Sequence, residues 1–355
     1  MFAYVGGYTT ADRDGRGNGI NVYRIDEATE TWTHVQTIGG LENPSLFTLN
    51  RAKTRLWSVH GGRTIMSAFA VDPASGHLTL LNQQNCLGNN PVDSALAPDE
   101  RHLVIANYGN GAVAVMPIAE DGRLLPVTQS ITLEGTPGPD PVHQASSHPH
   151  AVIFDPSGQF VVVPDKGFDR TFFFRFTAGR LAPTAQGSVA SARGAAPRHT
   201  VFHPHLPILY VNNELDSTVS VFNWDNIHGY VRETQVVTTI PDGHPGRNTT
   251  AEITSSACGR FLYVSNRGQD SIVLYNIDQV SGHLTFVEAV PTGGLRPRFF
   301  TINIKGDQIY AANQDSDDIT AFRIDSTTGR LSPTGIRITT GSPSAISLVA
   351  TPVAS

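Results

Sequence analysis

The stretch HPHAVIFDPSGQFVVVPDKGFDR, residues 148–170, decides the fold of this chain. It joins two apolar runs of strand length through the sequence DPSG at 155–158, and a proline and a glycine in such a link are typical of a β-hairpin turn. Polar side chains stand at both ends of the hairpin: two histidines precede the first run, and Asp165, Lys166 and Asp169 follow the second. Their meaning depends on whether the hairpin is a single feature or a repeated one.

The hairpin occurs six times along the chain with a constant internal spacing. Each copy has a residue, usually proline, before its first strand, and a residue, usually asparagine, at the end of its second strand. These two residues are always sixteen positions apart, although the copies themselves begin 47 to 58 residues apart. The six pairs are Pro44 and His60, Pro91 and Asn107, Pro149 and Asp165, Pro197 and Asn213, Thr250 and Asn266, and Pro297 and Asn313. A spacing that persists while the loops vary indicates one structural unit repeated along the chain.

Each repeat continues with a third alternating strand, and most continue with a fourth. Four short antiparallel strands in ~40–50 residues are typical of a propeller blade. The N-terminal segments 2–8, 19–26 and 31–38 match strands two to four of a further repeat, and residues 343–350 begin with the same proline and supply its missing first strand. The sequence therefore predicts an all-β, seven-bladed β-propeller, residues 1–355 forming one domain, with the C-terminal strand closing the ring in the N-terminal blade.

Composition excludes several classes of protein. The formal net charge is -6 and no basic tract is present, which argues against a nucleic-acid partner. No apolar run reaches the ~18–20 residues that cross a bilayer, and no signal peptide is visible in the first residues, so no membrane partner is expected. The two cysteines, Cys86 and Cys258, lie far apart and outside any metal-type spacing. A cytoplasmic location is the expectation.

Two columns of residues are expected to meet at one mouth of the ring. In an antiparallel hairpin the start of the first strand lies beside the end of the second, so the residues after the repeated proline approach those after the repeated asparagine. The first column is Ser45, Val92, His150, Arg198, Ala251, Arg298 and Ser344. The second is Gly61, Tyr108, Lys166, Glu214, Arg267 and Gln314, with Tyr8 from the N-terminal blade.

These columns differ from the repeated asparagine position itself. Asn107, Asp165, Asn213, Asn266 and Asn313 are explained by hydrogen bonds to loop backbone at a strand end. The column residues instead change from blade to blade, which is typical of an asymmetric ligand site on a symmetric scaffold. We expect catalytic roles for His150, Arg198, Glu214 and Arg267. We expect substrate contacts from Asn107, Asp165, Lys166, His199, Glu252, Arg298 and Gln314.

Five motifs follow one another along the chain: HPHAVIFDPSG (148–158), APRHTVFHP (196–204), YVNNELDSTVSVF (210–222), GRFLYVSNRGQDS (259–271) and ANQDSDDITAF (312–322). By these motifs the chain resembles the lactonase family of seven-bladed propellers, which includes a 6-phosphogluconolactonase and the fungal carboxymuconate cyclases. The resemblance covers nearly the whole chain and is strongest from the fourth blade to the seventh. By similarity to the cyclases, the active-site histidine falls on His150, the arginines on Arg198 and Arg267, and the glutamate on Glu214.

The resemblance implies hydrolysis of a sugar or sugar-acid lactone, phosphorylated or not. Lactone hydrolysis needs an activated water and positive charge where the oxyanion develops. Glu214 or His150 would be the base, and Arg198 and Arg267 would hold an anionic group and the oxyanion. A muconate cyclase would use the same residues in the opposite direction, and a non-catalytic scaffold remains an alternative from another class.

The expected partner is a small anionic or polyhydroxylated lactone, bound by a monomer or a homodimer. No cofactor is expected. No metal-ligand spacing is present either, although the ring of asparagine and aspartate residues leaves calcium open.

Overall fold

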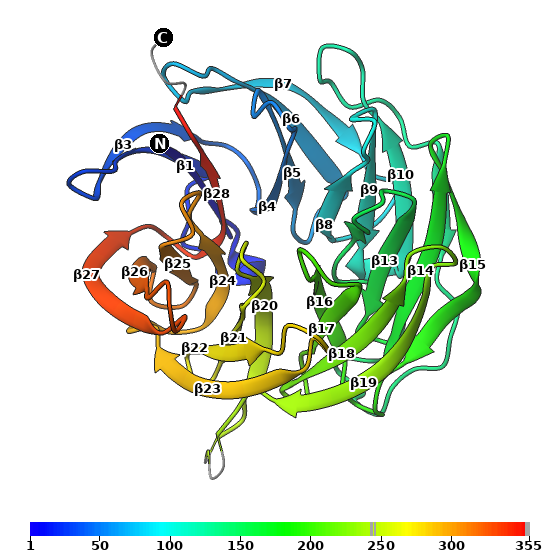
Figure 1. Cartoon of the computed structure of the whole chain (residues 1–355). Coiled ribbons are helices and arrows are strands. Elements are labelled where there is room, and N and C mark those ends of the chain that lie inside the picture. Colours follow the sequence, from blue (N-terminus) through cyan, green and yellow to red (C-terminus); the bar gives the residue numbers. More distant parts are fainter. Residues whose placement is uncertain (242–243, 245, 352–355) are drawn as a thin grey trace.

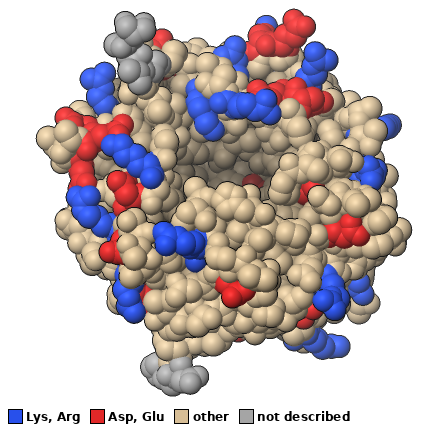
Figure 2. Space-filling model, in the orientation of Figure 1, with Lys and Arg blue, Asp and Glu red and all other residues tan. Residues whose placement is uncertain are grey.

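Seven four-stranded antiparallel sheets form a ring in the computed structural model, which describes residues 1–241, 244 and 246–351 (Figure 1). This arrangement confirms the predicted seven-bladed propeller. Figure 2 shows one face of the disk, hollowed at the centre of the ring, with acidic and basic side chains scattered over the surrounding blades. Only two short 3₁₀ helices interrupt the strands of the described residues: η1 (Ala11–Arg13) and η2 (Tyr108–Asn110).

The first three blades have the following strands, given from the centre of the ring outward. Blade 1 contains β28 (Pro343–Val349), β1 (Phe2–Gly7), β2 (Ile20–Asp26) and β3 (Thr31–Ile38). Blade 2 contains β4 (Pro44–Leu49), β5 (Arg55–His60), β6 (Ile65–Val71) and β7 (Leu78–Asn85). Blade 3 contains β8 (Pro91–Leu96), β9 (His102–Asn107), β10 (Ala112–Pro117) and β11 (Gln129–Thr132).

The other four blades follow the same order. Blade 4 contains β12 (Ile153–Phe154), β13 (Phe160–Asp165), β14 (Arg170–Thr177) and β15 (Arg180–Ala190). Blade 5 contains β16 (Pro197–Phe202), β17 (Ile208–Asn213), β18 (Thr218–Asp225) and β19 (Tyr230–Thr238). Blade 6 contains β20 (Thr249–Ser255), β21 (Phe261–Arg267), β22 (Ser271–Ile277) and β23 (Leu284–Pro291). Blade 7 contains β24 (Pro297–Ile302), β25 (Gln308–Asn313), β26 (Asp318–Ile324) and β27 (Leu331–Thr339).

The constant spacing of sixteen residues is a strand register. In all six copies the two residues that define the spacing are opposite one another across the first pair of strands. The register then shifts: in blade 5, Pro197 faces Asn213 but His199 faces Asn212, so Arg198 has no partner. The same shift follows the repeated position in every blade. A β-bulge redirects the side chain of the extra residue, so each blade aims one residue out of its ladder.

The ring is closed as predicted, because β28 pairs with β1 from Phe2 opposite Val349 to Gly7 opposite Pro343. The apolar cores lie between neighbouring blades rather than inside single sheets. One core joins Ala3 and Tyr23 of blade 1 to Tyr310 of blade 7. Apolar burial is therefore shared by adjacent blades, and each blade depends on its neighbours for much of its stability.

Polar clamps also join the blades. A side chain on the outermost strand of one blade accepts the backbone N–H of a residue at the start of the next blade's outermost strand or, for Leu124, five residues before that strand. The six clamps are Gln36 with Leu78, Asn82 with Leu124, Gln129 with Leu181, Gln186 with Val231, Gln235 with Leu284, and Glu288 with Leu331. Between blades 7 and 1 a different contact is present: Glu30 accepts hydrogen bonds from Gln308 at 2.6 Å and Arg323 at 2.7 Å.

Candidate functional site

The bulged residues gather around a cavity at one mouth of the ring. Six of the seven first-column residues line it. Two polar residues that follow the bulge, His199 and Glu252, also reach it. The full lining is Tyr8, Ser45, Leu46, Val92, His150, Arg198, His199, Glu252, Arg298, Phe299 and Ser344.

Glu214, directly after β17, is surrounded by three cations. Its carboxylate lies 2.8 Å from Lys166 Nζ, 3.0 Å from Arg198 Nε and 3.2 Å from Arg267 Nη2, and all four side chains are buried. Burial alone would raise the pKa of Glu214, but the charges of Lys166, Arg267 and Arg198 hold that pKa well below its usual value. Glu214 is therefore an ionised counter-ion shared by three cations.

The cations around this carboxylate are themselves held in place. Arg198 Nη1 donates to the carbonyl oxygen of Ala251, and Arg267 Nη2 donates to that of Thr250 at 2.7 Å. Burial lowers the pKa of Lys166 to about 8, against the opposing effect of the nearby carboxylate. Three cations around one carboxylate leave a net positive charge, which suits an anionic ligand.

His150 is a buried, neutral imidazole beside this cluster. Its ring centroid lies 5.6 Å from that of Tyr108 and 5.2 Å from that of His199. Its Nδ1 is buried and has no hydrogen-bond partner among the described residues. Burial, with smaller effects from Arg198, His199 and Lys166, lowers the pKa of His150 well below its usual value. The ring is thus unprotonated near neutral pH.

A second imidazole is paired with a carboxylate. His199 on β16 and Glu252 on β20 belong to neighbouring blades, and His199 Nδ1 lies 3.1 Å from both carboxylate oxygens of Glu252. In each blade a side chain on the second strand holds the backbone of this residue. The N–H of His199 donates to Asn212 Oδ1 at 2.9 Å, and that of Glu252 donates to Ser265 Oγ at 3.0 Å. The pair is therefore held rigidly at the cavity wall.

The cavity leads into an outer cleft past Tyr8 and Arg298, which line both spaces. The guanidinium of Arg298 lies 5.3 Å from the centroid of the Tyr8 ring. Gln314 lines the outer cleft, and its buried Oε1 has no partner among the described residues. The other lining residues are Asp12, Arg13, Asp14, Arg16, Arg296 and Asp315.

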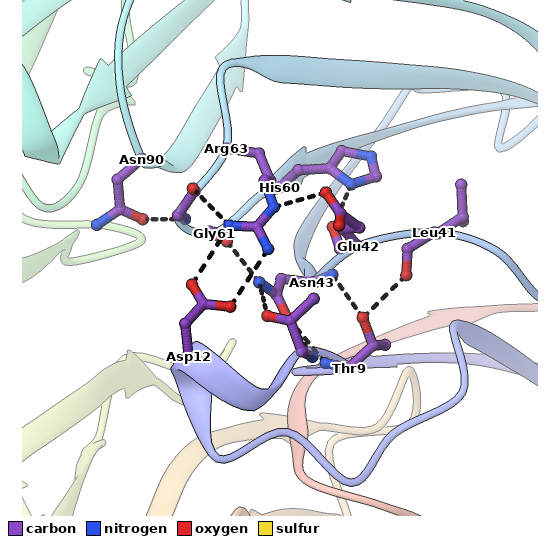
Figure 3. A network of polar contacts seen from close by, with 11 residues as sticks. Thr9, Asp12, Leu41, Glu42, Asn43, His60, Gly61, Arg63 and Asn90 are labelled. Carbon is purple, nitrogen blue, oxygen red and sulfur yellow. Dashed lines mark hydrogen bonds and ion pairs between the residues drawn. The ribbon is translucent and has the colours of Figure 1, made fainter.

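A polar network holds the loop between β1 and β2, which forms one wall of this cleft, against blade 2 (Figure 3). Asn43 Oδ1 accepts the backbone N–H of Thr9 at 2.8 Å. The guanidinium of Arg63 bridges Glu42 at 2.6 Å and Asp12 at 3.2 Å. The network gives this wall a defined position relative to the cavity.

Nine of the eleven residues singled out in the sequence lie in or beside these spaces. His150, Arg198, His199, Glu252 and Arg298 line the cavity, and Gln314 lines the outer cleft. Glu214 and Arg267 line a neighbouring cleft, and Lys166 joins them through its ion pair with Glu214.

Asn107 and Asp165 are placed differently. Neither lines the cavity or the clefts that the described residues form around the mouth. Asp165 accepts hydrogen bonds from Ser147 Oγ and from the backbone N–H groups of His148 and Phe168, the latter two at 3.0 Å. Burial raises its pKa. These contacts match the loop-bracing explanation at Asp165. At Asn107 they do not, because neither Oδ1 nor Nδ2 of that side chain has a hydrogen-bond partner among the described residues.

Asp93 on β8 is a half-buried carboxylate that the sequence analysis did not single out. Its Oδ2 accepts the N–H of Val152 from the next blade, and its Oδ1 accepts the N–H of Ser94, both at 2.8 Å. Burial, helped by the negative charge of Glu252, raises the pKa of Asp93 to about 7. A pattern in the sequence could have indicated Asp93. The residues two positions after the repeated position also differ from blade to blade: Leu46, Asp93, Ala151, His199, Glu252, Phe299 and Ala345.

Fold and site together define a propeller that encloses a positively charged cavity with two imidazoles, which is a site for a small anionic or polar molecule. A family model described as "Lactonase, 7-bladed beta-propeller" matches residues 2–348. The chain belongs to this lactonase family.

Relatives with known names or structures include three of particular interest. The chain is 35% identical over 302 residues to the 6-phosphogluconolactonase of Bacillus subtilis, covering 84% of each protein. A periplasmic gluconolactonase of Pseudomonas aeruginosa superposes with a TM-score of 0.91 at 33% identity over 99% of both chains. A putative 6-phosphogluconolactonase of Bacteroides fragilis gives 0.90 at 29% identity over 98% of both. Within the described residues, no helix is both long and apolar enough to span a membrane.

Proposed function

We propose that this protein hydrolyses the lactone of a sugar or sugar acid, with an anionic group such as a phosphate or carboxylate on the substrate. Membership of the lactonase family and the names of the relatives support this reaction class. The observation that carries the proposal is the cluster of Lys166, Arg198 and Arg267 around Glu214, placed beside the neutral His150.

The charge of this cluster suits the chemistry of a lactone. When water attacks the carbonyl carbon, negative charge develops on the carbonyl oxygen, and fixed positive groups stabilise it. Arg198 lines the cavity and is held by Glu214, so its guanidinium needs no rearrangement to donate. Arg298, at the junction of cavity and outer cleft, is placed to hold an anionic group at the far end of the substrate.

The test is steady-state hydrolysis of a panel of sugar, sugar-phosphate and muconate lactones, with and without EDTA. We expect turnover of at least one sugar or sugar-phosphate lactone. Arg198→Lys keeps the charge but loses the bidentate fork, so we expect KM to rise and kcat to fall, whereas Arg180→Lys on the exposed side of β15 should be neutral.

Two outcomes would replace this proposal. Turnover confined to muconate substrates would identify a cyclase, which places the same residues around a closing ring. No turnover of any substrate, in protein that melts cooperatively, would favour a binding scaffold. Loss of activity in EDTA would add a metal requirement.

We further propose a cytoplasmic location. Both cysteines are free, which fits a reducing compartment. Cell fractionation tests this proposal, and recovery of the protein from the periplasm, the location named for the Pseudomonas aeruginosa relative, would contradict it.

A further inference from the structure

The proposed hydrolysis needs a group that takes a proton from water, and Glu214 is poorly placed to do so. Its carboxylate is the shared counter-ion of Lys166, Arg198 and Arg267, at 2.8 to 3.2 Å. Protonating this carboxylate would leave three buried cations without their negative partner, which is strongly unfavourable. A base must accept its proton easily as the water attacks, so the geometry of Glu214 argues for a structural role.

His150 is a weaker acceptor than its position suggests. Its buried Nδ1 has no partner, so no described group selects its tautomer or its ring orientation. After burial, the groups that most lower its pKa are Arg198, His199, Lys166 and Arg298, and no carboxylate is among them. An imidazolium formed at His150 would face these positive charges without a carboxylate to stabilise it.

His199 meets the requirements that His150 lacks. It lines the cavity, and its Nδ1 lies 3.1 Å from the buried carboxylate of Glu252. This contact fixes Nδ1 as the protonated nitrogen and leaves Nε2 free to accept a proton. As the imidazolium forms, the negative charge of Glu252 stabilises it, which is the arrangement that histidine–carboxylate pairs provide in hydrolases. The side-chain anchors on both backbones keep the pair aligned.

We propose that His199 is the general base of this enzyme, with Glu252 as its positioning residue and Glu214 as the holder of the cations. This assignment rests on the proposed lactone hydrolysis. Water gives one proton to His199 Nε2 while its oxygen bonds to the lactone carbonyl carbon. The bond from that carbon to the ring oxygen then breaks, and the ring oxygen takes the proton back from His199. The product is a hydroxy acid, whose carboxyl group releases a proton to solvent.

The experiment compares His199→Ala, His150→Ala and Glu252→Gln on the lactone that the panel identifies, with added imidazole. We expect His199→Ala to lower kcat by roughly 10²–10⁴-fold with KM within about threefold, and imidazole to restore turnover in proportion to its concentration. A structural role would not produce this chemical rescue. His150→Ala should show no rescue by imidazole. Glu252→Gln should lower kcat by roughly 10²-fold or more, and Glu252→Asp should retain more activity than Glu252→Gln.

Each outcome has a defined meaning. Thermal melting of every variant identifies any that fail to fold, and Glu252→Gln, which preserves shape, keeps the test valid if His199→Ala is one of them. Imidazole rescue of His150→Ala but not His199→Ala would overturn the assignment in favour of His150. Near-normal kcat in both His199→Ala and Glu252→Gln would also overturn it while leaving lactone hydrolysis intact. An inactive wild-type protein would instead refute the proposed function, and this assignment with it.

Discussion

Glu214 is a buried acidic residue that serves as the counter-ion of three cations. Replacing it with glutamine keeps its shape but leaves Lys166, Arg198 and Arg267 without a negative partner. Breaking a buried ion pair from one side costs about 3–5 kcal/mol, so we expect Glu214→Gln to lower the free energy of unfolding by that order. Because the cations then lose their fixed positions, KM should rise as well.

Urea denaturation and steady-state kinetics measure these two effects together. The exposed Glu233→Gln on β19 serves as the control and should change neither quantity. A normal unfolding midpoint combined with a kcat loss of 10²-fold or more at constant KM would show instead that Glu214 is the base.

We expect Lys166 to make substrate binding sensitive to pH. Burial lowers its pKa to about 8, so the cluster loses one positive charge as the pH rises through 8. We expect KM for an anionic substrate to increase between pH 7 and 9, and Lys166→Arg, which keeps its charge, to abolish the increase. Kinetics across this range test the idea, and a KM that rises equally in both proteins would contradict it.

The same ionisation makes the free energy of unfolding depend on pH. The folded pKa of about 8 lies below the ~10.4 of an unfolded lysine, so the stability linked to Lys166 is present above pH ~10.4 and is lost as the pH falls through 8. At neutral pH the folded protein therefore carries the full cost of a buried, charged lysine, offset by its ion pair with Glu214.

Sequence alone predicted which residues differ between blades and that Arg198 approaches Glu214 within one hairpin, but not the contacts between blades. His150, Arg198 and Arg298 stand in one column of the repeat and do share a cavity. The sharing of Glu214 by three cations depends on side-chain reach across blades, which no spacing in the sequence contains. Asp93 was missed because its position becomes meaningful only when the next blade is known to present the N–H of Val152.

At the level of single strands, a β-bulge places the residue after the repeated proline at the mouth of the ring in each blade. The sequence shows that this residue differs between blades, but it does not show the bulge. The spacing of sixteen residues includes the extra residue in every copy, so the number alone does not show that a bulge is present. Only the paired register, in which Pro197 faces Asn213 while His199 faces Asn212, shows that Arg198 stands outside the ladder.

The clamps between blades make a separate prediction. Gln235 accepts the N–H of Leu284 at 2.7 Å and donates to its carbonyl oxygen at 2.9 Å. Gln235→Ala removes both bonds and leaves the first residue of β23 without them, so we expect a loss of about 1–3 kcal/mol in unfolding free energy. Urea denaturation measures it, with the exposed Thr285→Ala on β23 as the control. An unchanged midpoint would mean that water replaces the clamp without cost.

For the whole molecule, ring closure rests on one strand. Deleting residues 343–355 removes β28, exposes the edge of β1 and opens the core shared by blades 1 and 7. We expect a sharp fall in Tm, and partial recovery when a synthetic peptide of residues 341–351 is added. Thermal melting followed by circular dichroism tests both statements. An unchanged Tm after the deletion would show that the other six blades are stable as an open ring.

The joining of β28 to β1 also sets an order of events during synthesis. A ribosome releases β1, β2 and β3 first, yet β28, the innermost strand of their sheet, is the last of the described strands to emerge. Ser344 and Tyr8 meet at the cavity wall only at that moment. A nascent chain therefore cannot assemble the site while it is being made, and the N-terminal blade must wait with one edge unpaired until translation is nearly complete.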